Sequence, residues 1–151
     1  GAKTLQGRDA IFKELSSSEF NPLTYVILEE PSRLTTNTSG ENLQKEANPT
    51  ILEYSPNSVT IKATLLEDGY LVLGDTFYPG WNAYVDGEKN RVLKTNYILR
   101  SVFLEKGAHL VQFIYEPKSF TIGMIITLTS IAILIPVSIS CNRFVNRIRR
   151  R

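Results

Sequence analysis

Two aspartates are the first candidates for chemistry in this sequence. Asp75 and Asp86 stand 11 positions apart, and two carboxylates held about 5–10 Å apart can hydrolyse a glycosidic bond. Asp86 is already accounted for, because Asp86-Gly87 is a sequence typical of a tight hairpin turn. Asp75 follows an apolar run, and its carboxylate can instead cap the turn over residues 76–80. We therefore expect no catalytic pair here.

Aromatic side chains near the same turn suit a second kind of chemistry. Trp81 is the only tryptophan, and Tyr78 and Tyr84 lie close to it in sequence. Flat aromatic faces stack on the C–H surfaces of sugar rings, so these residues form a candidate sugar platform. Alternatively, Pro79-Gly80 turns the chain so that Trp81 fills the core of a small β-domain. The interior position is the one we expect.

Asn96 and Arg100 form the third candidate group. An arginine among apolar strand residues needs a carboxylate or a phosphate as its partner. We expect Asp75 to be that partner, and the phosphate of a lipid carrier is the alternative. His109 is the only histidine and has no cysteine near it in sequence, so we expect a solvated turn histidine and no metal site. The candidate substrate-binding residues are Asp75, Tyr78, Trp81, Asn96 and Arg100, with no catalytic residue, no metal ligand and no cofactor.

Short β-strands must position these residues. Across residues 69–115, apolar runs alternate with turn dipeptides such as Pro79-Gly80 and Lys106-Gly107. This pattern is typical of an antiparallel β-sandwich, either a jelly roll or an immunoglobulin-like fold. Residues 70–73 are apolar throughout and suit a central strand. The expected strands are 24–29, 50–54, 58–65, 70–73, 81–85, 90–94, 98–104 and 109–115, preceded by a short helix over 9–17 that Asp9 caps.

One segment reads as a loop and another as a membrane span. Residues 31–48 have no period and few apolar side chains, so they predict an exposed loop, and we do not expect its sequon at Asn37 to be glycosylated. Residues 119–142 carry no charge, and residues 120–141 are long enough to cross a hydrocarbon core of about 30 Å. Ser119 is a possible cap of this helix, and Pro136 predicts a kink.

Charge fixes the expected orientation of that span. Residues 1–118 hold 12 basic and 15 acidic residues, whereas the tail over 143–151 carries only positive charge. Its arginines are Arg143, Arg147, Arg149, Arg150 and Arg151. Such a tail predicts a cytoplasmic membrane anchor and an extracytoplasmic domain over 1–118. The scattered basic residues of that domain indicate no nucleic-acid binding. Because no signal segment precedes an exported domain, we expect the C-terminal part of a longer membrane protein.

A string of motifs in order resembles the C-terminal region of the YfhO-like bacterial membrane proteins. The motifs are Asp75-Thr76-Phe77-Tyr78-Pro79-Gly80-Trp81, Val85-Asp86-Gly87, Asn96-Tyr97, Arg100, Gly107 with His109, and Tyr115-Glu116-Pro117-Lys118-Ser119-Phe120. The resemblance covers about 52–135. It departs at Gly74, where a serine is more usual, and in the 31–48 loop, which has no family signature.

The resemblance implies a multi-pass glycosyltransferase of the GT-C-like class in the bacterial cell membrane. Such a protein takes sugar from a polyprenyl-phosphate donor and decorates envelope polymers such as teichoic acid. Its catalytic acid is expected in an early external loop outside this sequence, so the 151 residues would be accessory. The expected partners are the bilayer, upstream transmembrane helices and, as ligands, the polyprenyl-phosphate sugar or the envelope glycopolymer. The alternative is a membrane-tethered module that binds carbohydrate without catalysis or is purely structural.

Overall fold

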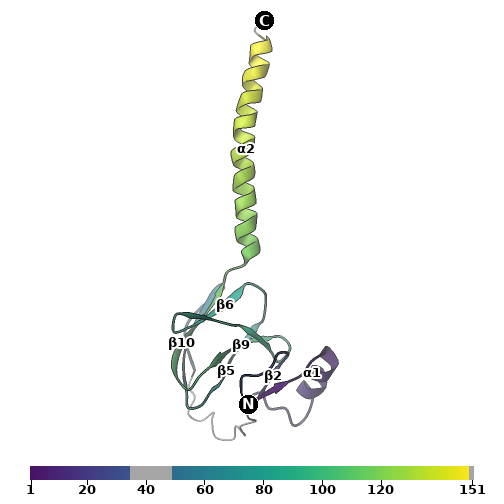
Figure 1. Ribbon diagram of the computed structural model, residues 1–151, viewed down its shortest axis with the longest axis vertical. Coiled ribbons are helices and arrows are strands. Elements are labelled where there is room, and N and C mark those ends of the chain that lie inside the picture. The colour runs from purple at the N-terminus through teal and green to yellow at the C-terminus, as the bar shows by residue number, and fades with distance from the viewer. Residues whose placement is uncertain (35–48, 150–151) are drawn as a thin grey trace. The chain divides into compact units, whose positions relative to one another are not determined.

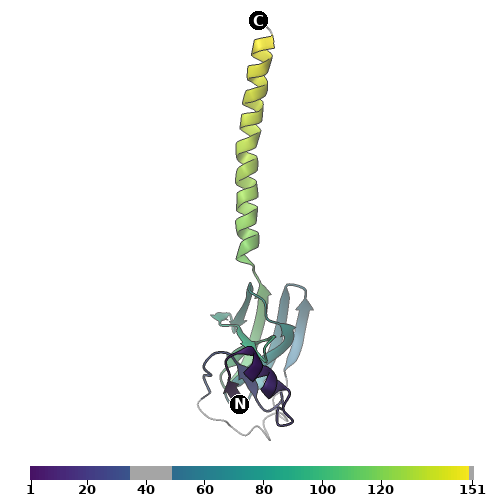
Figure 2. The same ribbon diagram turned by 90° about the vertical axis from the view of Figure 1, so that its right-hand side faces the viewer.

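Two units make up the chain in the computed structural model, which describes residues 1–34 and 49–149 (Figures 1 and 2). Gly1–Glu116 is mainly β-structure, and Pro117–Arg151 contains one long helix. The mainly β fold with a single membrane-length helix, predicted from the sequence, is therefore confirmed. Most of the predicted loop over 31–48, including Asn37, lies outside the described residues.

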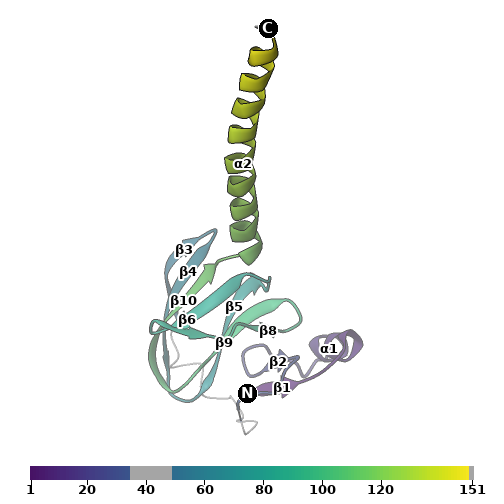
Figure 3. The same cartoon turned by 45° about the horizontal axis from the view of Figure 1, so that its top comes forward.

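Two five-stranded sheets form the first unit (Figure 3). The first sheet has the order β1 (Ala2–Thr4), β2 (Val26–Leu28), β8 (Leu93–Thr95), β9 (Leu99–Leu104), β5 (Gly69–Thr76). The second has the order β3 (Thr50–Ser55), β4 (Ser58–Leu65), β10 (Gly107–Tyr115), β6 (Trp81–Val85), β7 (Glu88–Asn90). All strand pairs are antiparallel except β1 with β2, which run parallel. The short β1 was missed because its three residues show no alternating apolar pattern.

Two predictions about individual strands were wrong. The strand expected over 90–94 is two strands, β7 and β8, which belong to different sheets. The segment over 70–73 is part of β5, which lies at the edge of its sheet instead of the centre. Its apolar character has another explanation, because the segment after β2 lies against it. There the Arg33 amide donates a hydrogen bond of 2.9 Å to the Tyr70 hydroxyl.

Alternating side chains of the second sheet build the main core. On β4, Val59, Ile61 and Ala63 are buried and Lys62 is exposed, as the period of two predicts. Thr60 breaks the pattern, because it is buried between neighbouring strands on the opposite face. The buried cluster contains Val59, Ile61, Ala63, Leu73, Ala83, Val102, Leu104, Val111 and Phe113. This core joins β4, β6 and β10 to β5 and β9 and holds the ends of these strands in place.

The N-terminal helix is shorter than expected. Helix α1 spans Arg8–Leu15, and its N-cap is Gly7, which makes no side-chain cap. Asp9 is therefore inside the first turn, where its negative charge still suits the helix dipole. Ile11 is buried, whereas Phe12 remains partly exposed and packs against Tyr97 with ring centroids 4.8 Å apart.

The second unit is the helix α2, which spans Lys118–Arg149. Its segment Lys118–Ile139 is long and apolar enough to cross a membrane. Ser119 lies inside the helix and is not its cap, and Pro136 is also internal. Helical backbone continues through Arg149, so part of the predicted tail extends the helix; the side chains of Arg143, Arg147, Arg150 and Arg151 lie outside what the structure describes.

Three hydroxyl groups in the middle of α2 are satisfied within the helix itself. Thr127 donates to the Gly123 carbonyl at 2.9 Å, and Ser130 donates to the Ile126 carbonyl at 2.8 Å. Thr129 makes the same kind of bond to Ile125. In hydrocarbon every polar group needs such a partner, so these residues do not oppose insertion into a bilayer.

Candidate functional site

A buried ion pair occupies the centre of the candidate site. Arg100 on β9 donates from Nη to Asp75 on β5 at 2.7 Å, which confirms the internal pair expected from the sequence. Arg100 is 2% exposed, whereas the Asp75 side chain is 31% exposed. Leu73 is the partner of Arg100 in the β5–β9 ladder, and the register shifts between Leu73 and Thr76, so Asp75 lies within this irregularity beside the arginine. The pair therefore links neighbouring strands within one sheet.

Trp81 covers the same arginine from the second sheet. The Arg100 Cζ lies 3.7 Å from the centroid of the Trp81 ring, a close cation–π contact. Trp81 also packs on the core, and the Tyr115 ring lies 5.3 Å away at a tilt. The expected interior position is thus largely correct, and the ring has the added role of stabilising the buried arginine. Tyr78, by contrast, is 61% exposed.

Sequence reasoning missed a third member of this cluster, Tyr54 on the edge strand β3. Its hydroxyl donates to both carboxylate oxygens of Asp75, at 3.1 and 3.0 Å. This hydrogen bond to a carboxylate raises the pKa of Tyr54. The sequence held no signal for this contact, because β3 and β5 belong to different sheets. The two side chains meet only when the two sheets pack together.

The Arg100 guanidinium is incompletely satisfied. Its Nε is buried and has no hydrogen-bond partner among the described residues. Burial lowers the pKa of Arg100, and the negative charge of Asp75 opposes that shift. An arginine does not lose its proton under these conditions, so Arg100 keeps its positive charge, which the Asp75 carboxylate balances and the Trp81 ring face stabilises.

Asn96 serves the fold and not a ligand. With Tyr97 it forms the turn between β8 and β9, where both residues have positive φ, 49° and 72°. The Asn96 amide donates to the Ile27 carbonyl, and the Ile27 amide donates to Oδ1 of Asn96, both at 2.8 Å. This reciprocal pair ties the turn to β2, so the side-chain oxygen is already used.

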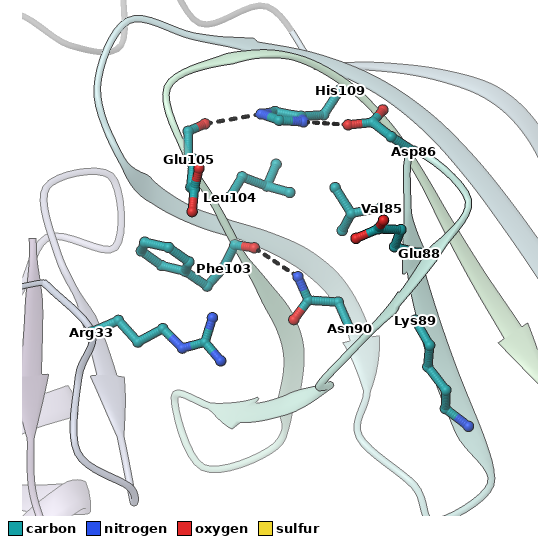
Figure 4. Close-up of a pocket in the computed structure, with 10 residues that line it drawn as sticks. All are labelled: Arg33, Val85, Asp86, Glu88, Lys89, Asn90, Phe103, Leu104, Glu105 and His109. Atoms are coloured by element: carbon teal, nitrogen blue, oxygen red, sulfur yellow. Dashed lines mark hydrogen bonds and ion pairs between the residues drawn. The ribbon is translucent and has the colours of Figure 1, made fainter.

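A cavity of about 340 Å³ lies around the β6–β7 hairpin (Figure 4). Charged side chains of both signs surround a small apolar floor in this cavity. Its lining residues are Arg33, Val85, Asp86, Glu88, Lys89, Asn90, Phe103, Leu104, Glu105 and His109. None of the five candidate substrate-binding residues lies in it, so the structure separates the predicted cluster from this cavity.

His109 at this cavity is not the solvated turn residue that we expected. It lies on β10, where its Nδ1 is 2.6 Å from Oδ2 of Asp86 and its Nε2 is 3.0 Å from the Glu105 carbonyl oxygen (Figure 4). Asp86 also accepts a hydrogen bond from the Leu110 amide at 2.8 Å. Asp86 and Gly87 both have positive φ, as the predicted tight hairpin requires. His109 therefore links the β6–β7 turn at Asp86 to the β9–β10 turn at Glu105, and we call these two contacts the brace.

This brace makes the stability of the fold depend on pH. The bond to Asp86 raises the pKa of His109, so its stabilisation is present in full below about pH 6.5 and is lost as pH rises through the folded-state value. The bonds from Leu110 and His109 lower the pKa of Asp86, so its stabilisation is present above about pH 3.9 and is lost on further acidification. The pair contributes most between these limits.

We expect His109→Gln to destabilise the chain more at about pH 5 than at about pH 8, because protonated histidine makes the stronger bond to Asp86. Urea unfolding of the 151-residue chain in detergent micelles measures the difference from wild type at each pH. Lys89→Gln is the matched control in the same cavity and should cost the same at both pH values. A His109→Gln penalty that does not change with pH would contradict the brace.

The last residue of the β-unit is also held in place. The Glu116 amide donates to the Gly80 carbonyl at 2.7 Å, and its carboxylate accepts from Asn82 at 3.0 Å and from Tyr84 at 3.3 Å. Tyr84 is thus bound to a carboxylate instead of forming a sugar platform with Trp81. These contacts fix the chain to β6 two residues before α2 begins.

The chemistry within reach of these groups is limited. No group of three or more potential metal-binding side chains occurs within residues 1–34 and 49–149. Asp75 and Asp86 were the candidate catalytic carboxylates. Each is bound to a side chain of the β-unit, Asp75 to Arg100 and Asp86 to His109. Together the fold and the site define a class of protein: a β-sandwich with internally paired charges, joined directly to a membrane-length helix.

Comparisons with known proteins show the family of the chain. The family model described as bacterial membrane protein YfhO matches residues 32–127, so the chain belongs to the YfhO family. A relative, the uncharacterized protein YfhO of Bacillus subtilis (strain 168), is 26% identical over 84 residues. The aligned part is 56% of this chain and 10% of the relative, so the match spans about a tenth of the relative's length. No solved structure matches the chain.

Proposed function

We propose that this chain is an extracytoplasmic accessory domain and a membrane span of a multi-pass glycosyltransferase. The full protein transfers a sugar from a polyprenyl-phosphate donor to an envelope polymer such as teichoic acid. Residues 1–118 face outward, the arginine tail stays in the cytoplasm, and α2 packs against upstream helices. YfhO family membership and the membrane-length helix support this proposal, and the sugar chemistry follows the resemblance of the sequence motifs.

The observation that carries the accessory role is the internal use of Arg100. An arginine that binds a phosphate presents its planar donor edge to the ligand. Here one Nη donates to Asp75, and the guanidinium lies against Trp81. Asp75 in turn is bound by Tyr54. The most conspicuous charged cluster of the sandwich therefore holds its two sheets together, which suits a scaffold for a catalytic centre elsewhere in the protein.

A second candidate function is a carbohydrate-binding module, which the exposure of Tyr78 favours. Sugar binding by aromatic residues requires an open ring face. Arg100 covers the Trp81 ring at 3.7 Å, and Tyr84 is bound to Glu116. One exposed tyrosine is a small platform for a polymer, so we rank this function second.

Complementation in cells that lack the full protein tests the proposal. We expect polymer glycosylation to be lost in these cells and restored by the wild-type protein. Arg100→Ala should reduce glycosylation only in proportion to the amount of protein, because its role is structural. Lys62→Ala, an exposed residue of β4, should match wild type in both measurements.

Two results would overturn the proposal in different ways. Unchanged polymer glycosylation in cells without the protein would show that the protein is not the glycosyltransferase for this polymer. Arg100→Ala protein at normal abundance with no glycosylation would instead show that the sandwich handles substrate, and the accessory role would then be wrong.

A further inference from the structure

We propose that one end of the sandwich binds the lipid surface directly. This aromatic end consists of Tyr54, Tyr78, Trp81 and Tyr115. Its partner is the headgroup region of the bilayer that α2 crosses. The inference goes beyond the glycosyltransferase proposal and does not depend on it, because it requires only that α2 is inserted in a membrane.

Three segments that are distant in sequence bring these side chains to the same end. Tyr54 lies on β3 and Trp81 begins β6, while Tyr115 ends β10 and pairs with Trp81 in the ladder. Tyr78 comes from the connection before β6, and its ring lies 6.4 Å from that of Tyr115. Tyr54 is linked to the other rings by a series of contacts. Its hydroxyl binds Asp75, Asp75 pairs with Arg100, and Arg100 is stacked on Trp81. The fold brings Tyr54 and Tyr115 to Tyr78 and Trp81, which are neighbours in the sequence.

Two of these four side chains are largely exposed. Tyr54 and Tyr78 are 60% and 61% exposed, and Trp81 and Tyr115 are half-buried. Within the part of the chain that the structure describes, nothing accepts a hydrogen bond from the Trp81 indole N–H or the Tyr78 hydroxyl. Tyrosine and tryptophan with an apolar body and a free polar group are the residues enriched where a membrane meets water.

The opposite end of the strands has a different character. β5 and β9 pair Tyr70 with Phe103 at that end, where the cavity carries Arg33, Lys89, Glu88 and Glu105. Such charges favour water over a lipid surface. The two ends therefore differ in their exposed side chains. Tyr54 and Tyr78 are exposed at one end, where the charges of Asp75, Arg100 and Glu116 have internal partners. The cavity end exposes charged side chains, and its aromatic pair, Tyr70 and Phe103, is half-buried.

The covalent connection favours the aromatic end for lipid contact. Only Glu116 and Pro117 separate Tyr115 from Lys118, the first residue of α2. A fully extended chain covers about 3.5 Å per residue, so Tyr115 stays within about 11 Å of the start of the helix in any arrangement. The headgroup region of a bilayer is several ångströms deep on each side. A helix inserted in the bilayer thus keeps this end within reach of the lipid surface.

Trp81 provides a direct test because it is the only tryptophan. The 151-residue chain is reconstituted in phosphatidylcholine vesicles that contain lipid brominated either near the glycerol backbone or near the end of the acyl chain. We expect the shallow bromines to reduce Trp81 fluorescence about two-fold more than the deep ones, as for an interfacial tryptophan. Equal fluorescence in brominated and ordinary vesicles would overturn the proposal.

Two variants control for the position of the probe. Trp81→Phe combined with Tyr78→Trp moves the probe to the most exposed ring of the aromatic end and should be quenched at least as strongly. Trp81→Phe combined with Phe103→Trp moves it to the charged end and should escape quenching by either lipid. Quenching of the Phe103→Trp probe would show nonspecific adsorption and overturn the assignment.

A final measurement separates lipid from carbohydrate at the same surface. Soluble teichoic acid fragments are added to the chain in vesicles without bromine, and the Trp81 emission is followed. We expect no shift. A shift with the fragments, together with no quenching by brominated lipid, would assign the aromatic end to glycopolymer binding and overturn the lipid contact.

Discussion

Arg100→Ala should lower the free energy of unfolding by about 3 kcal/mol. Removing one member of a buried ion pair costs about 3–5 kcal/mol, because the other charge is left without its partner. The value falls at the lower end because Asp75 is 31% exposed and keeps its bond from Tyr54. Loss of the cation–π contact with Trp81 adds to the cost. Urea unfolding in micelles, followed by far-UV circular dichroism, measures the change.

The chain offers a matched control for this substitution. Arg91 and Glu30 form an ion pair of 2.8 Å, close to the Arg100–Asp75 distance, but their side chains are 68% and 46% exposed. Arg91→Ala should therefore cost less than about 1 kcal/mol. Equal penalties for Arg91→Ala and Arg100→Ala would show that burial of the Asp75 pair contributes nothing.

Phe113→Ala should be the most damaging of the core substitutions, with a loss of about 4 kcal/mol. Truncating a buried phenylalanine removes its apolar burial and leaves a cavity, which together cost about 3–5 kcal/mol. Phe113 is fully buried on the central strand β10, between Val59 and Ala83 on the neighbouring strands. Its ring also lies beneath Arg100, with the Arg100 Cζ 5.6 Å from the ring centroid. The same unfolding experiment measures the effect.

Leu110→Ala on the same strand is the control. It shows how much of the Phe113→Ala loss of stability comes from burial and how much from the lower strand propensity of alanine. Leu110 is 41% exposed and pairs with Lys62, so its truncation should cost about 1 kcal/mol or less. If Phe113→Ala and Leu110→Ala cost the same, the core described around β10 does not control the stability of the chain.

Local patterns predicted much of this fold. The alternation over Ser58–Leu65 gave the correct strand and the correct buried face, and the apolar run after residue 118 gave the correct helix. Both signals depend on neighbouring residues alone. The Arg100–Asp75 pair was also predicted, because an arginine within an apolar strand requires an opposite charge and Asp75 directly follows an apolar run.

Features that depend on long-range pairing were not predictable in the same way. The chain passes from one sheet to the other within residues 90–94, and no local pattern marks such a crossing. Tyr54 reaches Asp75 across the two sheets, and Asn96 reaches Ile27 from a distant turn. His109 was misjudged because its partner Asp86 lies on another hairpin. Apolar periodicity and turn residues identify the strands in the sequence, but they do not show which strands become neighbours in a sheet.

The attachment of α2 to β10 has a mechanical consequence. β10 lies between β4 and β6 and is hydrogen-bonded on both sides, and it continues into α2 after two residues. Tension applied through the helix therefore enters the sandwich at the end of a strand that has two hydrogen-bonded neighbours. An edge strand such as β3 would pass the same force to one neighbour only.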